Sequence, residues 1–226
     1  ILRTNDFIYF QGGDNARYVL LGKSLAEGKG YRDIFRPGEP AHTQYPPLFP
    51  LFLSGVIRAK GMDSYYMKMV VSFFAAASLI LLFLLLRRGS FALPILAPIW
   101  LGTSYTYFNE TNSLLTETTY IAFSLAALLL FELWRERRRF ILLVPPVLAC
   151  WAAIMTRSIG ITLALALAAA FFFNEGRTKK SAGYSLLLLA ACLLPFIGWA
   201  ARNIAVGEVA SNYFSLSLIH ISEPTR

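Results

Sequence analysis

The feature that most constrains this chain is a series of apolar runs, each about 17–25 residues long, separated by short charged segments. Wound as a helix that rises about 1.5 Å per residue, a run of this length crosses the roughly 30 Å hydrocarbon core of a bilayer. Hydrophobic residues make up 56% of the chain and charged residues 15%, against about 45–50% and about 25% in a soluble domain. The sequence therefore predicts an all-α fold, a polytopic transmembrane helical bundle.

The apolar runs divide the chain into a long first loop and a membrane part. Residues 1–64 predict a polar loop that contains two short interfacial helices, and residues 65–215 predict the transmembrane domain. We expect five or six spans, over about residues 66–86, 91–108, 114–134, 140–155, 159–173 and 184–201. Pro145 and Pro146 are expected to kink the fourth of them.

Within the first loop, Asn15 to Glu27 predicts a helix with Asp14 at its N-cap and Gly28 as a stop signal. A second apolar helix is expected to follow Pro46-Pro47 and to run to about Lys60.

The two ends of the sequence look unlike natural termini. The chain opens at Ile1, and Leu216 to Arg226 reads LSLIHISEPTR, which resembles a translated sequencing adapter. We interpret residues 216–226 as a non-native tail and give His220 and Glu223 no functional weight. We expect the native part of this sequence to end near Ser215 and the natural protein to continue beyond it.

The basic residues predict an orientation. Arg87-Arg88, residues 135–139, and Arg177 with Lys179 and Lys180 fall in alternate loops, and short Lys/Arg-rich loops stay cytoplasmic. The net charge of +8 is thus better explained by membrane-flanking loops than by nucleic-acid binding. We expect a multi-pass protein of a bacterial inner membrane, with residues 1–64 facing the periplasm or exterior. Cys150 and Cys192 lie inside apolar runs and predict neither a disulfide nor a metal site.

Six polar residues on the predicted outer face are not explained by topology: Asp14, His42, Glu110, Glu117, Arg157 and Arg202. Glu117 is either a first-turn carboxylate that complements a helix dipole or a group that faces a cavity, and the sequence leaves both readings open. Arg157 and Arg202 are snorkelling anchors or, as we favour, ligands of a phosphate. Asp14 is a helix cap, a general base or a metal ligand, and His42 is a loop residue or a ligand.

Three motifs carry a resemblance to a known family: Gly13-Asp14-Asn15-Ala16-Arg17-Tyr18, Tyr45-Pro46-Pro47-Leu48-Phe49-Pro50, and Thr116-Glu117 at the start of a span. Together they resemble the GT-C class of membrane glycosyltransferases, in its bacterial branch of protein O-mannosyltransferases and lipid A aminoarabinose transferases. The resemblance implies transfer of a sugar, with inversion, from a polyprenyl-phosphate donor to a lipid, glycan or protein acceptor.

The resemblance also implies roles for particular residues. Asp14 would be the catalytic base and Glu117 a second acidic site residue, and either could hold a divalent cation such as Mg²⁺ or Mn²⁺. Arg157 and Arg202 would bind the donor phosphate. The substrate groove would be formed by Arg17, Tyr18, His42 and Tyr45. The chain departs from some relatives at Asn15, where a second acidic residue can stand, and at Gln44-Tyr45, where aminoarabinose transferases often carry a lysine.

A transporter or flippase for a lipid-linked anion is the alternative reading, since it would also need outward-facing arginines. Transporters place ionisable groups or broken helices near the middle of the membrane. No acidic or basic residue lies near the centre of any predicted span. The sequence therefore favours the enzyme.

Overall fold

The computed structural model describes residues 13–87, 89 and 92–206, and within them the fold is helical. The one β-type contact in this part is an isolated antiparallel bridge between Arg32 and Ala41. The helices are α1 (Asp14–Ala26), α2 (Leu48–Lys60), α3 (Ser64–Leu86), α4 (Leu93–Thr103), α5 (Tyr105–Thr111), α6 (Glu117–Arg137), α7 (Val144–Thr156), α8 (Ile161–Asn174) and α9 (Lys179–Ala205). Short 3₁₀ turns, η1 (Phe140–Leu143) and η2 (Ser158–Gly160), precede α7 and α8. The all-α prediction is confirmed for the described residues.

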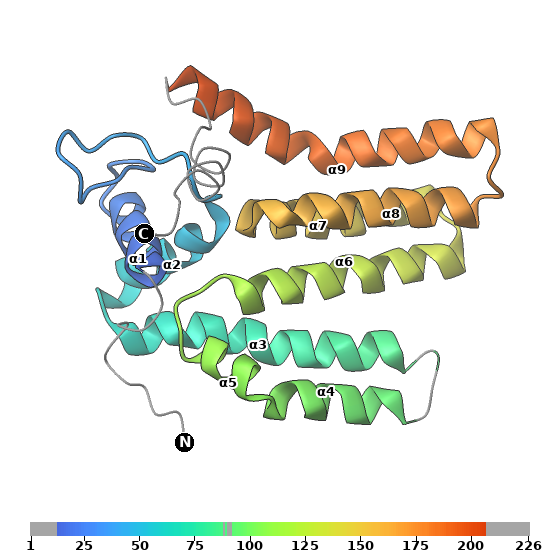
Figure 1. Ribbon diagram of the computed structural model, residues 1–226, viewed down its shortest axis with the longest axis horizontal. Coiled ribbons are helices and arrows are strands. Elements are labelled where there is room, and N and C mark those ends of the chain that lie inside the picture. Colours follow the sequence, from blue (N-terminus) through green and yellow to red (C-terminus); the bar gives the residue numbers. More distant parts are fainter. Residues whose placement is uncertain (1–12, 88, 90–91, 207–226) are drawn as a thin grey trace, which may run out of the picture.

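The long helices lie side by side, and the two ends of the bundle differ (Figure 1). One end carries α1, α2, the loop between them and the turn from α7 to α8, and we call it the site end. The opposite end carries Arg87 after α3, Arg135 and Arg137 in the last turn of α6, and Lys179 at the start of α9, and we call it the basic end. The basic residues that predicted a common face therefore do gather at one end of the bundle.

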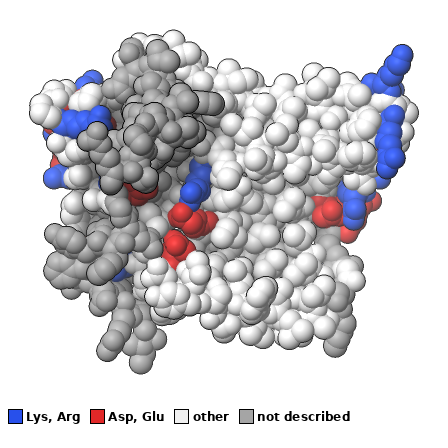
Figure 2. Space-filling model, viewed as in Figure 1, with Lys and Arg blue, Asp and Glu red and all other residues white. Residues whose placement is uncertain are grey.

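Three described helices are long and apolar enough to cross a membrane: α3, α6 and α9. The remaining apolar segments are shorter, namely α4 (Leu93–Thr103), Phe140–Thr156 and Ser158–Asn174. On the face shown in Figure 2, uncharged surface covers the middle of the bundle, and the charged side chains lie toward its two ends. This distribution is the one expected of a membrane protein, and by length and composition it supports three spans of the five or six predicted.

The predicted span over residues 91–108 is wrong in detail, because the chain breaks there into α4 and α5. Ser104 has extended backbone angles (φ −66°, ψ 136°), and its hydroxyl accepts a hydrogen bond from the amide of Tyr107. A serine side chain that caps a new helix N-terminus competes with the continuation of the old one. The break therefore follows from one side-chain hydrogen bond inside an otherwise apolar run.

Two other local predictions are corrected. Gly13, with φ 84°, takes the N-cap position of α1, and Asp14 is the first residue of the helix. Pro145 and Pro146 begin α7 instead of kinking it, since a proline in the first turn removes no intrahelical hydrogen bond. Among the described residues, Pro98 in α4 and Pro195 in α9 lie inside helices. Near Pro195, α9 bends (Figure 1).

Two apolar clusters hold the molecule together. One lies within α6–α9 and includes Phe131, Trp134, Ile154 and Leu167. The other lies at the site end, where α1 packs closely on α2: a Cβ added at Gly22 would stand 3.0 Å from the Cβ of Leu53 and 3.2 Å from the carbonyl oxygen of Pro50. The second cluster fixes α1 against the membrane part and so positions the polar residues that α1 carries.

Candidate functional site

Helix α1 places Asp14, Arg17 and Tyr18 on one face, because residues three and four positions apart are neighbours on a helix. The hydroxyl of Tyr45 donates a hydrogen bond of 2.7 Å to Oδ1 of Asp14. Nη1 of Arg17 donates to Oε1 of Gln44 at 2.8 Å and lies 3.5 Å from the same Tyr45 hydroxyl. Tyr45 thus connects a half-buried carboxylate to a cation one helical turn away.

The two tyrosines of this group are buried and pack against each other. The ring centroids of Tyr18 and Tyr45 lie 5.0 Å apart, and the ring of Tyr18 meets Phe49 edge-on at 5.3 Å. Burial, followed by the hydrogen bond to Asp14, raises the pKa of Tyr45 to about 12. Burial also raises the pKa of Tyr18 well above its ordinary value. Both phenols therefore stay protonated at neutral pH and can donate a proton to a hydrogen-bond acceptor, as Tyr45 does to Asp14.

A second group joins the N-terminus of α6 to the C-terminus of α7. Arg157, which follows the last residue of α7, forms an ion pair with Glu117 in the first turn of α6. Glu110 of α5 lies near both, and its pKa is raised by burial and by Glu117, against the opposing effect of Arg157. Within the described part of the chain, Oε2 of Glu110 and Oε2 of Glu117 are buried without a hydrogen-bond partner. Figure 2 shows acidic and basic side chains next to one another near the site end.

Tyr18 lies between the two groups. Its hydroxyl is hydrogen-bonded to Thr116, the residue before α6, and it interacts electrostatically with both Arg157 and Asp14. Asp14 and Glu117, predicted as the acidic pair of the site, therefore belong to one end of the bundle and have a tyrosine between them.

His42 is held by hydrogen bonds within the first loop, next to Tyr45. Its Nδ1 lies 2.7 Å from Oδ1 of Asp33, and its Nε2 accepts a hydrogen bond of 2.8 Å from the backbone amide of Tyr45. Burial lowers the pKa of His42, and Asp33 partly offsets this effect. The partners thus select the neutral imidazole that carries its proton on Nδ1. With both ring nitrogens used inside the loop and its ring stacked on Tyr45 at 5.3 Å, His42 positions Tyr45.

Arg202, near the end of α9, holds the first loop. Its Nη1 donates to the carbonyl oxygen of His42 at 2.5 Å, its Nη2 lies 3.4 Å from that of Tyr31, and its guanidinium lies 4.9 Å from the ring centroid of Trp199. Nδ2 of the next residue, Asn203, donates to the carbonyl oxygen of Thr43 at 3.0 Å. Arg157 and Arg202 are both at the site end, as predicted, but they contact different elements.

Four site-end residues were missed from the sequence: Tyr31, Asp33, Gln44 and Asn203. Gln44 and Asn203 directly adjoin predicted residues, and this adjacency was the one available signal. Asp33 and Tyr31 lie in a loop whose pairing with His42 and α9 has no local sequence pattern.

A divalent cation stays a prediction. No group of three or more His, Cys, Asp and Glu side chains that could hold a metal occurs among the described residues. A Mg²⁺ or Mn²⁺ bound at Asp14 or Glu117 would have few protein ligands and would take its other oxygens from water or a substrate phosphate.

No known protein family matches this chain, and neither does any curated protein or solved structure. The residues of the site end are therefore the basis on which a function is inferred.

Proposed function

We propose that this chain is an integral-membrane glycosyltransferase, or part of one, that moves a sugar from a polyprenyl-phosphate donor to a lipid, glycan or protein acceptor. The reaction would take place at the site end, on the periplasmic or outer face of a bacterial inner membrane. The observation that carries the proposal is the position of Asp14. Its carboxylate lies at one end of an apolar bundle, oriented by Tyr45 and one helical turn from Arg17.

The chemistry assigned to Asp14 is general-base catalysis. One carboxylate oxygen, Oδ1, accepts the hydrogen bond from Tyr45. We propose that the other oxygen, Oδ2, binds the hydroxyl group of the substrate that receives the sugar. Asp14 would take the hydroxyl proton as the acceptor oxygen attacks the anomeric carbon and the bond from that carbon to the phosphate oxygen breaks. A positioned general base contributes about 10²–10⁴-fold to such a rate.

The leaving phosphate needs positive charge, because negative charge develops on it as the bond breaks. Arg157 and Asp14 both interact electrostatically with Tyr18, so Arg157 is a cation close to the Asp14 group. Its ion pair with Glu117 orients the guanidinium. Arg202 would act from the end of α9, where it also holds the loop that carries His42.

A lipid-linked anion transporter is the competing function. In α3, α6 and α9 the charged residues lie within about two turns of a helix end. A transporter would place ionisable groups at mid-membrane. The position of the charges therefore supports chemistry at an interface over movement through the bilayer.

The test compares Asp14→Asn with a matched carboxylate change in the intact gene product. The control is Asp63→Asn, because Asp63 caps α3 and asparagine is an equally good cap. Membranes are supplied with radiolabelled lipid-linked sugars, and release of polyprenyl phosphate is measured. We expect Asp14→Asn to reduce turnover by at least about 100-fold at normal expression, and Asp63→Asn to leave it unchanged.

Full activity in Asp14→Asn would refute the catalytic assignment. If no sugar donor were consumed but labelled lipid crossed the bilayer in reconstituted vesicles, the transporter function would replace the enzyme.

A further inference from the structure

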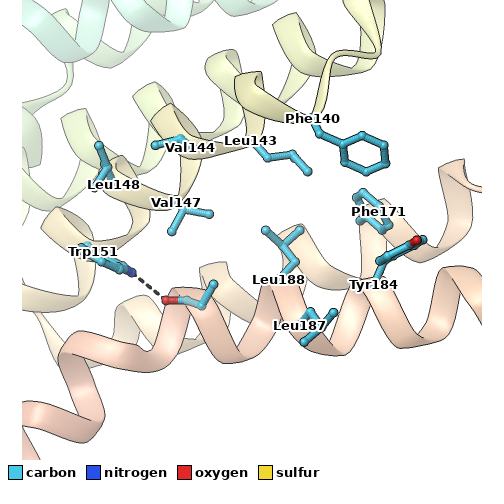
Figure 3. A pocket seen from close by; sticks show the side chains of 11 residues that line it. Phe140, Leu143, Val144, Val147, Leu148, Trp151, Phe171, Tyr184, Leu187 and Leu188 are labelled. Carbon is cyan, nitrogen blue, oxygen red and sulfur yellow. Dashed lines mark hydrogen bonds between the residues drawn. The ribbon is translucent and has the colours of Figure 1, made fainter.

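An apolar groove between α7 and α9 contains none of the site residues. Its volume is 350 Å³, and Figure 3 shows side chains of α7 and α9 facing each other across it. The lining is almost entirely hydrocarbon, and it includes Phe140, Val147, Trp151, Tyr184, Leu187 and Leu188. The indole N–H of Trp151 is already used in a hydrogen bond of 2.8 Å to the carbonyl oxygen of Ala191. The groove therefore suits a ligand part without polar groups.

The groove covers the depth of one leaflet. It begins at Phe140 and Tyr184, whose ring centroids lie 6.1 Å apart, and it ends at Trp151 and Ala191. Trp151 is eleven residues after Phe140, a helical distance of about 16 Å. Half of the hydrocarbon core is about 15 Å. A groove of this length matches one lipid tail that enters from the basic end.

Cations flank the mouth of the groove. Lys180 lies four residues before Tyr184 and hence on the same face of α9, and Arg139 directly precedes Phe140. Both side chains are exposed, and neither forms an ion pair with a carboxylate within the described residues. Two unneutralised cations beside an apolar groove complement a ligand with an anionic head and a hydrocarbon tail.

We propose that this groove binds an anionic glycerophospholipid of the leaflet at the basic end, with one acyl chain between α7 and α9 and the phosphate at Arg139 and Lys180. A protein helix suits the groove less well. A helix about 10 Å wide and 16 Å long fills about 1,200 Å³, which is more than the 350 Å³ of the groove. A helix could therefore insert only a row of its side chains. The proposal is independent of sugar transfer, since it involves the opposite end of the molecule.

Two neighbouring leucines allow a matched test of the tail. Leu187 lines the groove and is 66% exposed, whereas Leu186 is 65% exposed and does not line it. The intact gene product is exchanged into equimolar phosphatidylglycerol and phosphatidylcholine, and retained lipid is counted by native mass spectrometry. We expect Leu187→Trp to fill the groove and to reduce retained phosphatidylglycerol several-fold, and Leu186→Trp to retain the wild-type amount.

The headgroup is tested by charge removal at the same end. Lys180→Gln is expected to reduce the preference for phosphatidylglycerol over phosphatidylcholine by about fivefold, because each cation near an anionic headgroup contributes independently. Arg87→Gln, an exposed cation that follows α3, is the control and should leave the preference intact. A wild type without anionic preference, or equal retention by Leu186→Trp and Leu187→Trp, would overturn the proposal. Equal retention of lipid by Leu186→Trp and Leu187→Trp is also expected if another segment of the protein already fills the groove.

Discussion

At the site end, polar side chains connect segments that are far apart in sequence, whereas in the α6–α9 bundle apolar and small residues fill the space between helices. Arg202 reaches the carbonyl of His42 across 160 positions. In the bundle, Cys150, Ala153 and Ala164 are fully buried, and they allow the helices to approach closely. The structure of the site end thus depends on each hydrogen-bonding partner of a network. The packing of the bundle depends on the volume of the side chains between its helices.

This difference has a physical reason. In lipid there is no water to leave the interface between helices, so close packing through small residues drives their association. At the end of the bundle the backbone of an irregular loop must find partners, and side chains such as Arg202 and Asn203 provide them. The two regions should therefore respond differently to substitution.

The largest expected effect concerns the packing of α7 on η2, where the bundle turns from α7 to α8 at the site end. A Cβ at Gly160 would lie 2.8 Å from the backbone nitrogen of Ile154 and 2.9 Å from its Cα. Because those atoms belong to the helix backbone, they cannot move aside as a flexible side chain would. We expect Gly160→Ala to destabilise the protein by about 3 kcal/mol, measured by thermal unfolding in mild detergent.

The control for that change is Gly183→Ala in α9, where an added Cβ has nothing within 4 Å. Alanine should be neutral or slightly stabilising there, because it restricts the unfolded chain. Equal unfolding midpoints for both variants would show that packing at the turn does not limit the stability of the bundle.

The next effect concerns the joint between the two regions. Arg202→Gln removes a charged donor from the carbonyls of His42 and Tyr31. The carbonyl oxygen of Tyr31 keeps its hydrogen bond of 2.9 Å from the amide of His42, and leaving the carbonyl oxygen of His42 unsatisfied costs about 1–3 kcal/mol. We expect faster amide hydrogen exchange in residues 31–43 with little change in α6–α8. Arg87→Gln, at the basic end, should leave exchange in the loop as in the wild type, and an equal increase in both variants would contradict the role of Arg202.

A smaller, pH-dependent effect is expected inside the loop. Burial lowers the pKa of His42 below its ordinary value of 6.5, and the groups facing it are Asp33, Arg17 and Arg202. Below about pH 6.5 the unfolded chain therefore binds a proton that the folded protein does not, and stability falls as the pH decreases toward the folded pKa. The wild type should lose more thermal stability between pH 7.5 and 5.5 than His42→Gln. Parallel losses would show that His42 does not titrate differently on folding.

The smallest effect is expected for an exposed ion pair of the site end. Nζ of Lys29 lies 3.1 Å from Oε1 of Glu39, and this partner raises the pKa of the exposed lysine. Exposed pairs contribute little, because water and salt screen them. Lys29→Gln should leave the unfolding midpoint unchanged. A loss as large as that of Arg202→Gln would mean that charge alone, and not burial, holds the loop.

The apolar runs predicted α3, α6 and α9 well, since an uninterrupted stretch of that length has few folds other than a helix. The same reasoning was wrong where one side chain intervened. Ser104 splits the run over residues 91–108, because its hydroxyl caps a new helix. Pro145 and Pro146 were read as a kink, although their place in the first turn makes them a helix start. Such errors concern the place of single residues at a helix start, which hydrophobic periodicity does not detect.

The sequence by itself determined the helical, membrane-type character of the chain and the gathering of basic residues at one end, because helix formation and hydropathy depend on near neighbours. It also indicated which polar residues are unusual. Only the tertiary structure decided which of them meet: Tyr45 with Asp14 across 31 positions, Arg157 with Glu117 across 40, and Arg202 with the first loop. Contacts at such separations depend on how whole helices pack, and no local pattern encodes that packing.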